Sequence, residues 1–187
     1  MVTRGKELTI EDINYIAGFF DGEGNINIYK TDTENIRKVQ QLRNPKYELS
    51  VSMFNTDKGV IEWIHSIFGG SFMTRNRINT KSYNKKWKES YTIRLTANQA
   101  KSFLEIMYPY LRVKKTQAEI AIKFQEVKLN KKSRFARVTD EQVCFFENSY
   151  QQLRQTIDSC RNRFNGSVAD KRFHPQRLTE TTLEIVN

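Results

Sequence analysis

The sequence predicts an α+β fold in which a four-stranded antiparallel sheet carries helices on one face. Four segments alternate polar and apolar residues, which is the period of a strand with one buried face. The order strand, strand, helix occurs twice, over residues 25–67 and 71–107. One helix precedes the first pair of strands, so the predicted core order is αββαββα, followed by a C-terminal helical extension.

The length and composition predict one domain with an extension. The chain has 187 residues, of which 38% are hydrophobic and 12% aromatic, enough to form a core. We assign residues 1–130 to the core. Residues 131–187 are expected to form a basic linker, a helix and a partly ordered tail after Cys160, all within the same domain.

The net charge and the number and spacing of the Cys and His residues reduce the range of possible functions. A net charge of +10 favours a polyanionic partner, most commonly nucleic acid, although a merely basic soluble protein would carry the same charge. Cys144 and Cys160 have no zinc or redox spacing, and His65 and His174 are isolated. No apolar run is long enough for a membrane span or a signal peptide. We therefore expect no membrane partner and an intracellular location, in the nucleus, the cytoplasm, a mitochondrion or a chloroplast.

The first helix follows a loose leader of eight residues and is expected to run from Thr9 to about Gly22. Thr9 and Asp12 have the spacing of a capping box. Gly18 costs about 1 kcal/mol in a helix interior relative to alanine. The close approach of another backbone would give this glycine a purpose.

The remaining elements follow from the same patterns. Thr56 is expected to cap the second helix, which Gly69 and Gly70 end. Strands are predicted near residues 25–30, 47–54, 71–77 and 88–96, and later helices at 97–107, 115–129 and 139–158. Every strand has one apolar face and one polar or basic face.

Two acids stand where the first helix ends and the first strand begins. Asp21 and Glu23 lie at a helix C-terminus, where negative charge opposes the helix dipole, so a purely structural role explains them less well. Mg²⁺ prefers carboxylate and carbonyl oxygens, which Glu23 and the backbone of Gly22 can supply. A helix end without a metal is the alternative.

The stretch IAGFFDGEG at residues 16–24 resembles the helix motif of the LAGLIDADG homing endonucleases. The resemblance extends over residues 8–129 and includes the run PYLRVKKTQA at 109–118. It implies a site-specific, intron-encoded DNA endonuclease that makes a Mg²⁺-dependent staggered double-strand break. The break would have 3′ overhangs and lie in a long, near-palindromic target, and Mn²⁺ or Ca²⁺ could occupy the metal site.

The resemblance also implies the active-site residues. The metal-binding acid falls on Glu23, beside the Gly22 carbonyl, and the catalytic lysine falls on Lys114. Asp57 would help to organise the attacking water. A basic position of the family falls on Ile61, which is a departure, and Arg94 is a candidate replacement. The number of metals stays open, because the family's arrangement permits a shared third ion.

In the family, the polar sheet face enters the major groove of double-stranded DNA. Side chains such as Asn, Ser, Thr and Arg read base edges, and basic loop residues such as Arg37 and Lys38 would hold phosphates. In the third strand, either Thr74 and Asn76 or Arg75 and Arg77 face the DNA, and we retain the arginines. A solvated surface is the alternative for any one residue. The groove-facing set is then Asn25, Asn27, Tyr29, Thr31, Glu48, Ser50, Ser52, Phe54, Arg75, Arg77, Ser90, Thr92 and Arg94.

The chain has one copy of the motif, so it resembles the single-motif, homodimeric members of the family. Their motif helices pack together across a two-fold axis, which implies an interface through Ala17, Gly18 and Asp21. Two other functions stay open. One is an RNA maturase that assists intron splicing, and the other is a DNA-binding protein without cleavage, although the presence of Glu23 and Lys114 argues against the second.

Overall fold

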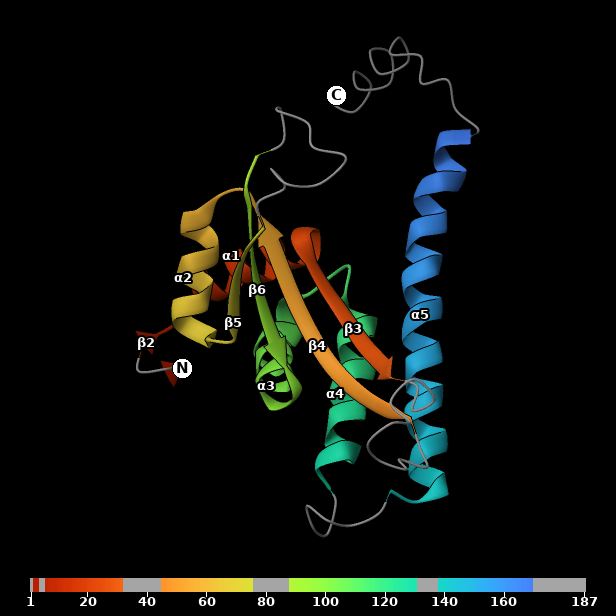
Figure 1. Ribbon diagram of the computed structural model, residues 1–187. Coiled ribbons are helices and arrows are strands. Elements are labelled where there is room, and N and C mark those ends of the chain that lie inside the picture. Colours follow the sequence, from red (N-terminus) through yellow and green to blue (C-terminus); the bar gives the residue numbers. More distant parts are fainter. Residues whose placement is uncertain (1, 4–5, 32–44, 76–87, 131–137, 170–187) are drawn as a thin grey trace, which may run out of the picture.

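The computed structural model describes residues 2–3, 6–31, 45–75, 88–130 and 138–169. The four-stranded sheet carries helices on one face, so the predicted α+β fold is confirmed (Figure 1). In chain order the elements are β1 (Val2–Thr3), β2 (Lys6–Glu7), α1 (Ile10–Glu23), β3 (Gly24–Thr31), β4 (Lys46–Asn55), α2 (Lys58–Phe68), β5 (Ser71–Arg75), β6 (Ser90–Thr96), α3 (Ala97–Met107), the 3₁₀ helix η2 (Tyr108–Tyr110), α4 (Lys115–Leu129) and α5 (Asp140–Ala169).

The sheet has the strand order β3-β4-β6-β5, and all neighbours are antiparallel. Ser52 pairs with Arg94, and Arg94 pairs with Ser71, so these three side chains share a face. Four residues further along, Arg75 pairs with Ser90 on that same face. The register left open for the third strand is therefore decided for Arg75 and against Thr74.

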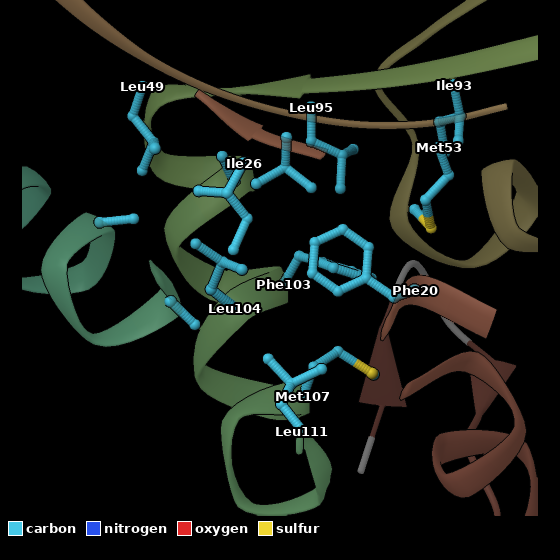
Figure 2. Packing of buried hydrophobic residues seen from close by; sticks show 14 of the residues in the cluster. Phe20, Ile26, Leu49, Met53, Ile93, Leu95, Phe103, Leu104, Met107 and Leu111 are labelled. Carbon is cyan, nitrogen blue, oxygen red and sulfur yellow. The ribbon is translucent and has the colours of Figure 1, made fainter. Parts of the chain in front are cut away.

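The core lies between the sheet and the helices (Figure 2). The apolar faces of the strands and of α1, α2, α3 and α4 meet there, as the alternation predicted. Phe20 of α1 contacts Phe103 of α3 edge to face, with ring centroids 5.0 Å apart. The fully buried large side chains of the core include Phe20, Ile26, Leu49, Met53, Ile93, Leu95 and Phe103.

Helix α1 begins and ends through local contacts. The Asp12 N–H donates to the Thr9 side chain at 3.1 Å, and the Thr9 N–H donates to Asp12 at 3.1 Å, which confirms the capping box. At the other end, a Cβ on Gly24 would lie 2.0 Å from the Phe20 ring and 2.5 Å from the Phe20 carbonyl oxygen. Only glycine fits there, so α1 can pass into β3 without a connecting loop.

Three local predictions were wrong. Asp57, and not Thr56, is the N-cap of α2, and its carboxylate accepts the Val60 N–H at 3.2 Å. The leader contains the short strands β1 and β2, which pair with each other. Helix α5 continues to Ala169, because helical hydrogen bonding propagates through polar residues after the apolar periodicity has ended. No helix among the described residues is long and apolar enough to span a membrane.

Candidate active site and nucleic-acid interface

The Asp21 side chain joins the end of α1 to the segment that precedes α4. Its carboxylate accepts backbone N–H groups from Arg112 at 2.7 Å, Val113 at 3.2 Å and Lys114 at 3.0 Å. Hydrogen bonds to a charged acceptor are about twice as strong as those between neutral groups. The segment 112–114 is thus fixed against α1, and Asp21 is engaged within its own chain.

The same segment brings Lys114 to the end of α1. The Lys114 ammonium donates a hydrogen bond to the Asp21 backbone carbonyl. That carbonyl belongs to the residue directly before Gly22 and Glu23, so the structure places a positive charge beside the two predicted metal ligands. The fold thus brings Lys114 to the end of α1, although Lys114 and Asp21 are 93 residues apart in the sequence.

Glu23 and Gly22 have the chemistry that a hard divalent cation requires. Glu23 is the last residue of α1, and both residues are exposed. One carboxylate and one carbonyl are a partial ligand set for Mg²⁺, which commonly completes its shell with water and phosphate oxygens. Among the described residues, no three His, Cys, Asp or Glu side chains form a metal cluster. The residues present fit a site that is completed by a bound phosphate.

Three other positions of the predicted site have defined surroundings in the structure. Asp57 caps α2, and its N–H donates to the Asn55 side chain at 2.9 Å. Ile61 is fully buried in the core, so no cation occupies that position. The Arg94 guanidinium lies 5.9 Å from the Tyr29 ring centroid, on the open sheet face. Lys114 thus supplies a cation at the end of α1, and Arg94 lies on the sheet face, paired with Ser52 of β4.

The polar face of the sheet is arranged in rows of paired residues. One row is Asn25, Ser52, Arg94 and Ser71. A second row, two residues further along β3, is Asn27, Ser50 and Thr96. Tyr29 pairs with Glu48, and Thr31 pairs with Lys46. The described members of the predicted groove-facing set thus share this face, which Lys46, Ser71 and Met73 join although they were not predicted.

Ser50 is the exception among these residues. It lies on the polar face but is only 3% exposed, so it is not available to a ligand in this structure, and the prediction that it contacts DNA is corrected. Its strand position was right, but alternation does not report what neighbouring side chains cover. Arg37, Lys38 and Arg77 lie outside the described residues.

Helix α1 has an open surface opposite the core. Gly18 and Gly22 are exposed, and a Cβ built on either would meet no atom within 4 Å. Ala17 is 1% exposed and belongs to the core, which corrects its assignment to an interface. Asn14, Gly18 and Gly22 recur every four residues on the open side.

A polar cluster joins α5 to the ends of β3 and β4, and the sequence analysis missed it. Glu147 forms an ion pair with Lys30 at 2.8 Å and accepts a hydrogen bond from the Tyr47 hydroxyl. Lys128 of α4 donates to the Tyr47 carbonyl at 2.5 Å. The hydrogen bonds from Lys30, Tyr47 and Gln151 lower the Glu147 pKa to about 2. No local signal identifies this cluster, because Glu147 lies 100 residues after Tyr47 in the sequence.

Comparisons with known proteins show the family and the fold of this chain. The family model described as LAGLIDADG endonuclease matches residues 16–128. A comparison with curated protein sequences finds no match for this chain.

Solved structures of homing endonucleases share the fold. I-SmaMI bound to its uncleaved DNA target is 15% identical with a TM-score of 0.58, over 80% of this chain and 46% of that chain. I-GzeII in complex with its DNA target is 17% identical with a TM-score of 0.53, over 76% and 43%. I-TnaI is 14% identical with a TM-score of 0.50, over 82% and 99%. Because the family model covers more than half of the sequence, the chain belongs to the LAGLIDADG endonuclease family.

Proposed function

We propose that the protein is a homing endonuclease that cuts both strands of a specific DNA site in a Mg²⁺-dependent reaction. The observation that carries this proposal is the contact between α1 and the segment 112–114, in which the Lys114 ammonium binds the Asp21 carbonyl, directly before Gly22 and Glu23 in the chain. Family membership and the DNA complexes of structurally similar endonucleases support it.

The residues have separable roles in this proposal. The Glu23 carboxylate and the Gly22 carbonyl would hold the cation. A bound divalent cation supplies Lewis-acid stabilisation and lowers the pKa of a water ligand. The Lys114 ammonium would offset negative charge that develops on the scissile phosphate. Asp21 holds Lys114 at the place where that charge develops, so Asp21 is a positioning residue.

The proposed active form is a homodimer through α1. The chain spans nearly all of I-TnaI but less than half of I-SmaMI and I-GzeII, as expected for a chain that supplies one of two equivalent halves. The open side of α1, with Gly18 and Gly22, would let a second helix approach closely. Two-fold symmetry would make the target near-palindromic. Two adjacent active sites over one minor groove would give a staggered break with 3′ overhangs.

Cleavage of DNA tests the proposal directly. A randomised duplex pool is incubated with the protein and Mg²⁺, and the cut molecules are sequenced to give the target and the ends. The wild type should cut one site and leave 3′ overhangs, and EDTA should stop cutting. Glu23→Gln should lower the cleavage rate at least about a hundredfold while DNA affinity changes little, because a ligand that organises the transition state is lost.

The matched control is Glu11→Gln, an exposed carboxylate in the first turn of the same helix. It should cut like the wild type. DNA binding without metal-dependent cutting would overturn the enzyme assignment. Equal cutting by Glu23→Gln would show that the catalytic acid lies elsewhere.

A further inference from the structure

An apolar row crosses the polar sheet face next to the end of α1. Phe54 of β4 pairs with Thr92 of β6, and Thr92 pairs with Met73 of β5, so the three side chains share one face. Phe54 is 54% exposed and Met73 is 39% exposed. Phe54 directly follows Met53, the partner of Gly24, so the row starts beside the place where Glu23 lies. Single exposed apolar residues are ordinary on protein surfaces, but adjacent ones across neighbouring strands form a patch.

The surroundings of this row indicate what it contacts. On one side lies the row with Ser52 and Arg94, and on the other lies the pair of Ser90 and Arg75. An apolar strip between two arginine-bearing rows, on a chain with a net charge of +10, favours a polyanionic partner over a neutral protein surface. It matches the major groove of DNA, where phosphates and guanine edges meet arginine and the thymine C5-methyl is the apolar group.

We infer that the row of Phe54, Thr92 and Met73 recognises thymine methyl groups at the inner positions of each half of the DNA target. This inference rests on the proposed function and adds a residue-level basis for its sequence choice. Phe54 and Met73 supply apolar contact surface, and the Thr92 methyl lies between them in the register. RNA carries uracil, which lacks this methyl, so the row favours DNA as the ligand.

Deoxyuridine substitution provides the test, because it removes only the C5-methyl. In the target found by cleavage selection, each thymine is replaced singly by deoxyuridine, and affinity is measured by fluorescence anisotropy with Ca²⁺ in place of Mg²⁺. At one or two inner positions of each half-site, deoxyuridine should weaken wild-type binding about fourfold, the value of one buried methyl group. In Phe54→Ala or Met73→Ala, thymine and deoxyuridine at that position should bind equally.

Controls separate this effect from misfolding and from other functions of the surface. Leu129→Ala truncates an exposed apolar residue of α4 and should keep the full deoxyuridine effect. The two row variants should keep the wild-type circular dichroism spectrum and their sensitivity to deoxyuridine at other positions. A target without inner thymines, or a methyl effect unchanged in both row variants, would overturn the inference while leaving the endonuclease assignment intact.

Two other results would also overturn it. If Phe54→Ala changes the oligomeric state and leaves the deoxyuridine effect unchanged, the row is a protein contact. If no DNA is selected at all, the proposed function fails and the inference fails with it.

Discussion

At the scale of single residues, Asp21 makes tertiary hydrogen bonds that its position in the motif does not indicate. Its carboxylate accepts N–H groups from three successive residues that are 91–93 positions away in sequence. One side chain therefore fixes both the path of the chain before α4 and the position of Lys114. In the proposed function, Asp21 would act through Lys114, and Glu23 would be the acid that binds a metal.

Removing this carboxylate should affect stability and catalysis together. Asp21→Ala leaves three N–H groups without their charged acceptor, and we expect the free energy of unfolding to fall by about 2 kcal/mol. Asp21→Asn keeps an acceptor oxygen and should lose less. Urea denaturation measures the stability, and kcat/KM on the selected target should fall because Lys114 is no longer held. An unchanged kcat/KM in a folded Asp21→Ala protein would contradict the positioning role.

At the scale of elements, two glycines at the C-terminal end of α1 should respond differently to an added methyl group. Gly24→Ala places a Cβ against the Phe20 ring and backbone, and we expect a loss of about 2–3 kcal/mol in the free energy of unfolding. Gly22→Ala is the matched control, because its Cβ meets no atom within 4 Å. Thermal unfolding should show the large loss for Gly24→Ala alone. Equal losses for both variants would contradict the close-contact explanation.

The cluster that joins α5 to β3 and β4 predicts a pH dependence. The Glu147 pKa is lowered to about 2 in the folded protein. The stabilisation is therefore present above the ordinary carboxyl pKa and is lost as the pH falls toward 2. Because Glu147 is partly exposed, we expect about 1 kcal/mol from this interaction.

Urea unfolding of wild type and Glu147→Gln at pH 7 and pH 3 measures this effect. The variant should be less stable at pH 7, and the difference should shrink at pH 3. Glu141→Gln, in the exposed first turn of α5, serves as the control. A difference that stays constant with pH would show that Glu147 acts without its charge.

At the scale of the whole molecule, the open side of α1 predicts self-association. The wild type should sediment at twice the chain mass of 22.1 kDa, and Gly18→Leu should sediment as a folded monomer. Among the described residues, a Cβ at Gly18 meets no atom within 4 Å, so we expect a bulky side chain there to harm chiefly the contact between copies. Gly18→Leu should also lose double-strand cleavage. Lys123→Leu, at an exposed position of α4, is the control. A monomeric wild type at micromolar concentration would contradict the dimer.

The sequence by itself determined the features that depend on local contacts. The capping box of Thr9 and Asp12, the extent of α4 and the alternation of β3, β4 and β6 were predicted correctly. Periodicity and capping involve residues within a few positions of one another, so they can be read directly along the chain. Asp57 was missed as the cap of α2 because Thr56, next to it, is also a good capping residue.

The tertiary structure alone decided which distant residues meet. It paired Arg75 with Ser90, buried Ser50 on the polar face and joined Glu147 to Lys30 and Tyr47. Alternation assigns a residue to a face but cannot choose between two registers or show what covers a side chain. The meeting of Asp21 with segment 112–114 is of this kind, since it depends on how α1 and α4 pack against the same sheet.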